Sequence, residues 1–222
     1  MQKPNVEHLE HSVESEDALF GRDEERLHFA THFAGVLFVV LFGWRLWSAP
    51  GLTPNLQLGI GIYLVTFFVV FLASSFYHLT VLDRHRRLLR KLDHISIYFF
   101  IAGSNTPYLL GYGDDTGIVF LCLMWGLVLF GTIIKWFEIH LSEWLSLVFY
   151  LFLGWLGIVT VYLILDSLSL ASIFLVVLGG VLYSVGAYFY RHDTIKWYHG
   201  IWHLFVLAAA GCHFLAIYWQ VQ

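Results

Sequence analysis

Charged side chains are scarce in this chain. They make up only 13% of the 222 residues, whereas hydrophobic residues make up 59%. Soluble domains carry about 25% charged residues, so this balance excludes an ordinary water-soluble protein. Twelve Lys and Arg against sixteen Asp and Glu leave too few basic residues for a surface that binds nucleic acid, and we expect no such partner. Lipid, rather than water, is the expected solvent.

Cysteine and targeting signals are also sparse. The only two cysteines, Cys122 and Cys212, lie in apolar runs, so we interpret them as packing residues without a disulfide framework. The first 26 residues are polar and acidic, and they lack the basic start, apolar middle and cleavage site of a signal peptide. We expect residues 1–26 to form a mobile cytosolic segment and residues 27–219 to form one membrane domain.

Long apolar runs dominate the remainder of the chain. A hydrocarbon core about 30 Å thick requires about 20 helical residues to cross it. Seven stretches meet this requirement, near 27–47, 57–82, 93–111, 116–137, 143–165, 170–190 and 197–219. Backbone groups in lipid must be satisfied internally, and unbroken apolar runs favour helices over alternating barrel strands. The sequence therefore predicts an all-α integral membrane bundle of seven transmembrane helices.

The distribution of Lys and Arg predicts the orientation of this bundle. Basic residues precede the first helix and occur again after the second, fourth and sixth helices, and Arg45 alone falls at the opposite end. Basic loops stay on the cytosolic side of a membrane. We therefore expect a multi-pass protein of the cell membrane (plasma or inner membrane) with a cytosolic amino end and an external carboxyl end.

A few ionisable side chains fall within the predicted membrane helices, where each is a candidate for function because buried charge is costly in lipid. Ser74, His78, Asp93, His199 and His203 all lie in the cytosolic halves of their helices. Ser74 and His78 are four residues apart, as are His199 and His203, so each pair shares one helix face. With a rise of about 1.5 Å per residue, His78 and His203 both lie roughly 7–11 Å inside the cytosolic charges. These side chains can converge at one depth.

Three neutral imidazoles around an open position are typical of a catalytic zinc site, in which the pKa of a bound water falls to about 7. We interpret His78, His199 and His203 as ligands of Zn²⁺. Asp93 and Ser74 are the predicted catalytic residues, because Asp93 could orient that water or take its proton and Ser74 could bond to a reacting oxygen. Alternatively, the histidines satisfy core hydrogen bonds or lie at the headgroup boundary. Other divalent ions also suit three histidines.

A second histidine pair, His28 and His32, lies at the start of the first helix, with Glu25 one turn earlier. This pair could supply metal ligands instead. We favour the interpretation that it caps or packs the start of the helix, because no carboxylate lies at matching depth within the same helix. His213 lies roughly 15 Å beyond His203 along the helix axis, so it is predicted to be an internal hydrogen-bonding residue away from the metal.

Four segments together resemble the haemolysin III proteins, the bacterial branch of the progestin and adipoQ receptor family, which is grouped with alkaline ceramidases. They are SSFYHL (74–79), LDHISIYFFIAGSNTPYLL (92–110), GGVLYSVGAYFY (179–190) and HGIWHLFVLAAAGCHF (199–214). The resemblance implies that His78, His199 and His203 bind zinc and that Asp93 and Ser74 hold the water at the zinc. One departure is His28, which stands where the family pattern has Asn.

Three functions fit these residues. The first is a zinc-dependent hydrolase of lipid amide or ester bonds, whose substrate enters sideways from the bilayer. The second is a receptor-like membrane sensor without enzymatic activity, in which zinc ties helices together. The third is a lytic pore, which we rank last because the external halves of the helices are nearly uncharged. The resemblance implies a role in membrane-lipid homeostasis. The sequence does not determine the lipid, the signal or the oligomeric state.

Overall fold

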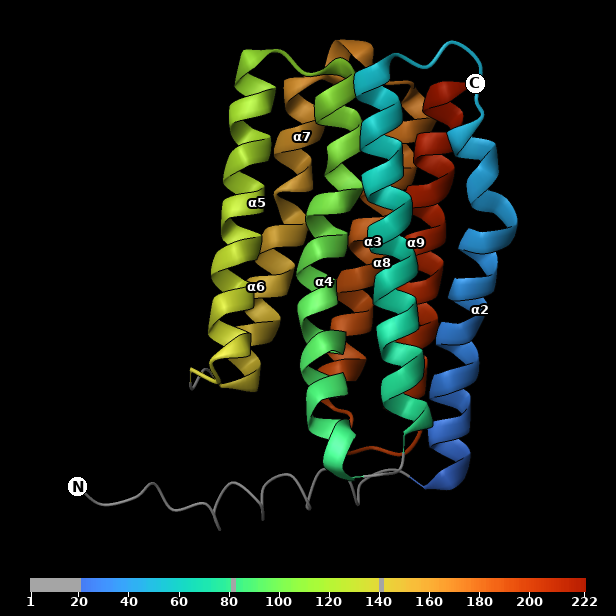
Figure 1. Ribbon diagram of the computed structural model, residues 1–222, viewed down its shortest axis with the longest axis vertical. Coiled ribbons are helices and arrows are strands. Elements are labelled where there is room, and N and C mark those ends of the chain that lie inside the picture. Colours follow the sequence, from blue (N-terminus) through green and yellow to red (C-terminus); the bar gives the residue numbers. More distant parts are fainter. Residues whose placement is uncertain (1–20, 81–82, 140–141) are drawn as a thin grey trace, which may run out of the picture.

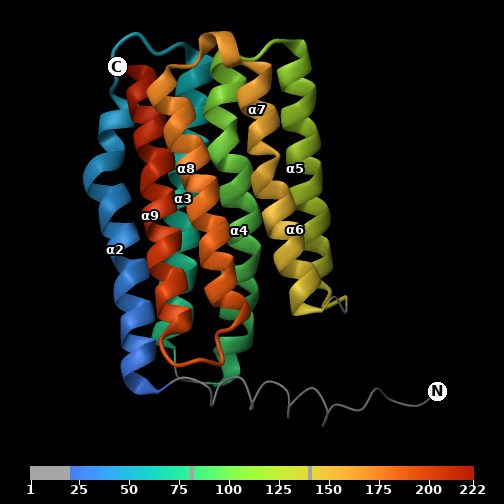
Figure 2. The same cartoon turned by 180° about the vertical axis from the view of Figure 1, so that it is seen from behind.

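The computed structural model describes residues 21–80, 83–139 and 142–222, and all regular structure within these ranges is helical. The helices are α2 (Arg22–Trp47), α3 (Pro54–Leu79), α4 (Asp83–Tyr112), α5 (Asp115–Trp136), α6 (Glu143–Trp155), α7 (Gly157–Leu163), the 3₁₀ turn η1 (Leu165–Ser167), α8 (Leu170–Arg191) and α9 (Tyr198–Val221). They run along the long axis of the molecule, with α2 at one edge of the bundle and α5 at the other (Figures 1 and 2). The predicted all-α class is confirmed.

Six helices within the described ranges are long and apolar enough to cross a membrane. They are Asp23–Trp47, Pro54–Leu79, Asp115–Trp136, Trp144–Leu163, Leu170–Arg191 and Tyr198–Val221. Large apolar side chains face outward on these helices. Examples are Val119, which is 68% exposed, and Phe174, which is 63% exposed. Such exposed apolar surface suits contact with lipid. The count of seven spans and the orientation of the two ends stay predictions.

Helix α4, which contains the predicted third span, begins with a run of charged residues and carries three polar side chains in its second half. Ser104, Asn105 and Thr106 each donate a hydrogen bond to a backbone carbonyl four residues earlier in the same helix, at 2.8–2.9 Å. These bonds use a donor of each side chain within the helix, and the Thr106 hydroxyl also accepts a hydrogen bond from the Trp125 Nε1 of α5 at 3.3 Å. α4 can therefore lie inside the bundle despite its polar residues.

Two helices begin earlier than hydropathy predicted. α2 begins at Arg22 rather than 27, because its acidic first turn suits the positive end of a helix dipole and Glu24 accepts a hydrogen bond from the Gly21 N–H. α4 begins at Asp83 rather than 93, because charged residues outside the hydrocarbon can still be helical. Of the predicted polar segment, residues 1–20 lie outside the described residues.

The predicted fifth span, 143–165, is divided. α6 ends at Trp155 and α7 begins at Gly157, with Leu156 between them, and the segment finishes in η1. Leu156 keeps helical backbone angles (φ −59°, ψ −18°), so the interruption is local. The other spans agree with their predicted bounds to within about three residues.

Close packing of α3 against α4 depends on small residues. A Cβ atom at Gly59 would lie 2.6 Å from the Pro107 Cα atom, and one at Gly103 would collide with the Thr66 side chain. Glycine removes these obstacles, as is common where membrane helices approach closely. Next to this contact, aromatic rings of α3 and α4 form the centre of the main core. Phe67 and Phe71 of α3 are both fully buried there. α3 thereby holds a fixed position between α2 and α4.

Candidate metal centre

Four imidazoles from three helices meet at the end of the bundle where α2 and α9 begin and α3 ends. α2 supplies His28, α3 supplies His78, and α9 supplies His199 and His203. Their ring centroids lie 4.7–5.6 Å apart for all six pairs. His28, His78 and His203 are at most 5% exposed. The structure thus brings the three histidines predicted as ligands together and adds His28 to them.

The nitrogen atoms of this cluster are close enough to hold a metal ion. One possible ligand atom from each of His28, His78 and His199 lies within 4.8 Å of the other two. His203 is not in this group of three, but its ring lies next to the group, with its centroid 4.7 Å from that of His199. Imidazole suits zinc and also copper, iron and nickel. The donor set therefore fits a divalent transition metal, and its identity stays open.

Partners at Nδ1 orient three of the rings. The His78 Nδ1 lies 2.8 Å from Glu25 Oε2, and the His199 Nδ1 lies 3.6 Å from Asp193 Oδ2. Metal-binding histidines commonly donate the proton of one ring nitrogen to a carboxylate and bind through the other nitrogen. This pattern points to Nε2 as the metal-binding atom of His78, whereas the distance from the His199 Nδ1 to Asp193 is longer than a hydrogen bond.

The third ring, His203, has a hydroxyl partner. Its Nδ1 lies 3.5 Å from Thr31 Oγ1, and this hydroxyl donates to the backbone carbonyls of Leu27 and His28. Because the hydroxyl proton is directed to those carbonyls, the oxygen can accept the proton of Nδ1. His203 is then also oriented to bind through Nε2.

Glu25 connects the cluster to the basic first turns of α4. Besides its contact with His78, its Oε1 accepts a hydrogen bond from Arg86 at 2.7 Å, and Oε2 lies 3.9 Å from the His28 Nδ1. The Glu25 side chain is only 18% exposed, so these charges are weakly screened by water. Glu25 was not among the predicted site residues. Its spacing of three residues before His28 was the available signal, since it places both on one helix face.

Ser74 and Asp93 lie beside the cluster. Ser74 is one helical turn before His78 and is 2% exposed, and its hydroxyl donates a hydrogen bond to the Asp93 carboxylate on α4. The structure therefore joins the two predicted catalytic residues to each other, one turn from a histidine of the cluster.

The remaining buried histidines lie outside this group of four rings. The His32 ring is 4.0 Å from His203 but 6.5 Å from His78, and it packs on Phe71. His213 packs against Gly179 and stacks on Tyr183 at 5.9 Å between ring centroids. His213 is thus away from the cluster, as predicted.

Two contacts hold α2 against the start of α9. The Trp197 backbone N–H donates to Glu24 Oε1 at 2.7 Å, and Trp197 has a left-handed conformation (φ 69°) where α9 begins. A Cβ atom at Gly200 would lie 2.9 Å from Leu27 Cδ2 and 3.6 Å from His28 Cδ2. Glycine at position 200 therefore permits the helix approach that brings His28 to His199.

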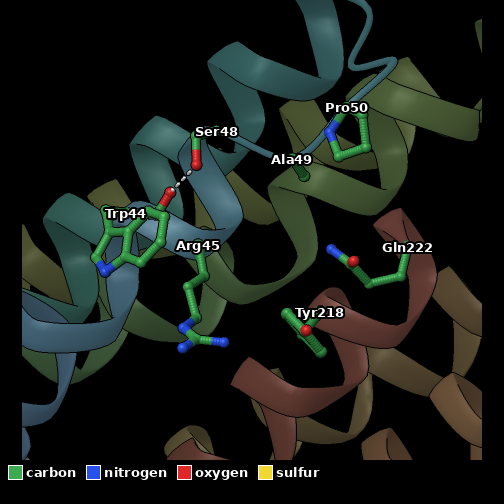
Figure 3. Close-up of a pocket in the computed structure, with 7 residues that line it drawn as sticks. All are labelled: Trp44, Arg45, Ser48, Ala49, Pro50, Tyr218 and Gln222. Atoms are coloured by element: carbon green, nitrogen blue, oxygen red, sulfur yellow. Dashed lines mark hydrogen bonds between the residues drawn. The ribbon is translucent and has the colours of Figure 1, made fainter.

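A separate hollow lies at the opposite end of the bundle, between the ends of α2 and α9 (Figure 3). It is lined by Trp44, Arg45, Ser48, Ala49, Pro50, Tyr218 and Gln222. None of these lining residues is a histidine or a carboxylic acid, so this hollow lacks the donors found in the histidine cluster. We therefore regard the cluster as the candidate functional site.

Comparison with known proteins places the chain in a family. A family model described as "Haemolysin-III related" matches residues 20–214. A hemolysin-3 homolog of Bacillus subtilis (strain 168) is 35% identical over 207 residues, which cover 90% of this chain and 95% of the relative. Hemolysin-3 of Bacillus cereus is 33% identical over 170 residues, covering 76% and 78% of the two chains.

More distant similarity extends to animal proteins. The monocyte to macrophage differentiation factor of Homo sapiens is 29% identical over 164 residues, covering 71% of this chain and 68% of the relative. The resemblance drawn from the four sequence segments is thus confirmed. With its six apolar helices the chain is a multi-pass membrane protein, and a location in the cell membrane fits the bacterial family. The chain belongs to the haemolysin III-related family.

Proposed function

We propose that this protein binds zinc at the histidine cluster and hydrolyses an amide or ester bond of a membrane lipid. The observation that carries the proposal is the pairing of Ser74 with Asp93 one helical turn from a buried group of imidazoles, in which the Nδ1 atoms of His78 and His203 have partners. A zinc ion held by three histidines polarises a carbonyl group and lowers the pKa of a water molecule at its open position.

Each residue of the candidate site has a distinct role in this proposal. His78, His199 and His203 hold the metal, while Glu25, Asp193 and Thr31 fix the orientation of their rings. Asp93 takes a proton from the attacking water and delivers it to the leaving group. Ser74 keeps the Asp93 carboxylate in place through its hydrogen bond.

Membrane lipids are the proposed substrates and partners. The outer surfaces of the helices are apolar, with Leu79 near the site at 57% exposure and Phe76 at 49%. Both residues lie in the last turn of α3, within four residues of His78. A lipid in the surrounding bilayer would therefore meet apolar side chains close to the cluster, as lateral access requires.

A second function, a sensor without enzymatic activity, is favoured by one observation. The cluster joins α2, α3 and α9, and contacts such as His28 to His199 at 4.7 Å span most of the chain. A metal at this point would stabilise one packing of the three helices, which is sufficient for a sensor. This function predicts stability that depends on metal without turnover of any lipid.

Lipid hydrolysis by purified, metal-quantified protein distinguishes these functions. We would measure the release of free fatty acid from a panel of ceramides and phospholipids for the wild type, Asp93→Asn and His199→Ala. Asp115→Asn is the matched control, because Asp115 is exposed at the opposite end of the bundle. Turnover that Asp93→Asn abolishes with zinc retained supports the hydrolase. Zinc binding without turnover across the panel contradicts it and favours the sensor.

A further inference from the structure

We propose that His28 is a fourth imidazole ligand of the metal, so that the resting site holds four histidines rather than three. This inference rests on the metal binding of the proposed function and concerns how that site is regulated. His28 lies on α2, and the sequence left it as an alternative ligand while favouring a packing role for it. The arrangement of the four rings and the packing around His28 carry the proposal.

The four rings have the spacing of a tetrahedral site. A Zn–N bond of about 2.05 Å and a ring radius of about 1.2 Å place each centroid about 3.2 Å from an ion, so tetrahedral imidazoles have centroids about 5.2 Å apart. The observed distances are 4.7–5.6 Å for all six pairs among His28, His78, His199 and His203. His32 does not fit this arrangement, because its ring is 6.5 Å from His78.

Possible ligand atoms of His28 also lie close to those of two other histidines. The group of three residues whose ligand atoms lie within 4.8 Å of one another contains His28 together with His78 and His199. Its side chain is fully buried, and the carboxylate that orients His78 also faces the His28 Nδ1 at 3.9 Å. One acidic side chain, Glu25, thus faces two of the four imidazoles, as expected when both are ligands of the same ion.

The local packing holds His28 in this place. Gly200 permits α2 to approach α9 beside His28, and the bond from Trp197 to Glu24 fixes the first turn of α2. Thr31, one turn later on α2, bonds to the His28 carbonyl and faces the His203 ring. The same face of α2 therefore contributes an imidazole and a ring-orienting hydroxyl to the cluster.

A fourth imidazole has a consequence for access to the metal. Four histidines complete a tetrahedral shell, and the open position that a catalytic zinc site requires is then filled. In the resting protein His28 thus occupies the place of water or substrate. Lipid hydrolysis requires either that His28 leaves the ion or that the coordination number rises to five.

Cobalt substitution tests this inference without any measurement of activity. We would load the wild type, His28→Asn and His28→Ala with Co²⁺ in detergent, record visible absorption spectra, and titrate each protein with azide. His192→Asn is the control for loss of one histidine, because His192 is exposed and bonds only to a carbonyl of its own helix in the described structure. Folding of each variant would be checked by size-exclusion chromatography.

We expect azide to leave the spectra of the wild type and the control unchanged and to shift the spectrum of the His28 variants, whose fourth position is open. We also expect the variants to bind zinc more than about 100-fold more weakly, since even loss of an outer partner of a ligand costs roughly 10–100-fold. Identical azide responses in the wild type and the His28 variants would overturn the inference, whatever their turnover of lipid.

Zinc K-edge absorption of the wild type provides a second measurement that needs no variant. Four imidazole nitrogens and no oxygen in the first shell would support the proposal, whereas three imidazoles and one oxygen would refute it while leaving the hydrolase intact. A wild type that binds no divalent transition metal would refute both this inference and the proposed function. Lack of lipid turnover with four bound imidazoles would count against the hydrolase alone.

Discussion

Replacement of Glu25 by Gln provides a sharp test of the metal centre. The Glu25 carboxylate lies 2.8 Å from the His78 Nδ1 and accepts a hydrogen bond from Arg86 at 2.7 Å. Glutamine has nearly the same shape, but it loses the charge, and its NH₂ group faces one of the two donors. Because the side chain is only 18% exposed, water replaces these interactions poorly.

The expected size of the effect follows from these contacts. A hydrogen bond to a charged group contributes about 1.5–3 kcal/mol. Loss of the partner that orients a metal-binding histidine weakens metal binding roughly 10–100-fold, which corresponds to about 1.4–2.7 kcal/mol. The two figures are of similar size, so we expect the dissociation constant for zinc to rise by at least a factor of 10 in Glu25→Gln.

Asp23→Asn is the matched control for this experiment. Asp23 lies in the same helical turn, and its substitution changes the net charge by the same amount. Its side chain is 83% exposed, and its pairing with Arg26 at 3.5 Å is a surface ion pair of small energetic value. Both dissociation constants would be measured by competition with a chromogenic chelator. Values for the two variants within threefold of each other would refute the role assigned to Glu25.

Three further predictions concern packing, catalysis and metal removal. Gly200→Ala should weaken zinc binding, because its Cβ would lie 2.9 Å from Leu27 and force α2 outward. Gly211→Ala on the same helix meets no atom within 4 Å and should leave zinc binding unchanged, as competition with a chelator would show. Ser74→Ala should retain zinc and reduce lipid turnover roughly 10–100-fold, since Asp93 loses the hydroxyl that positions it; equal turnover at equal zinc content would contradict this. Chelation should lower the melting temperature by about 5–10 °C if the ion is present at about 100 times its dissociation constant, measured with a thiol-independent fluorescence assay; an unchanged value would exclude a stabilising metal.

Much of the helical framework could be predicted from hydropathy, because lipid imposes one requirement on every span. The first residues of α2 and α4 could not be placed this way. Their first turns are charged and lie beyond the apolar runs, where a helix is held by dipole and capping interactions such as that of Glu24. The interruption at Leu156 has no counterpart in hydropathy either, since apolar residues continue on both sides of it.

The candidate site was predictable only in part. Depth and helical spacing predicted that His78, His199 and His203 converge, and the structure brings their rings together. The spacing of four residues between His199 and His203 places both on one face of α9. The same reasoning left His28 as a packing residue, since depth alone does not show which helices are neighbours. Which helices are neighbours depends on close contacts between them, such as that of Gly200 on α9 with Leu27 on α2. Such a contact can be recognised only in the folded structure.

The first and last helices of the described structure, α2 and α9, meet at this site, and this arrangement would couple metal binding to the fold. Thr31 and His203 are 172 positions apart in sequence, and Glu24 and Trp197 are 173 apart. Contacts of such sequence separation join residues from the first and last helices of the bundle. Few other interactions hold α2 in place, because its extensive contacts are with α3 and α9. An ion shared by His28 on α2 and His199 on α9 would stabilise this closure directly. If His28 binds the ion as proposed, this stabilisation would be lost whenever His28 leaves it, so a ligand that favours the open site would also weaken the contact between α2 and α9.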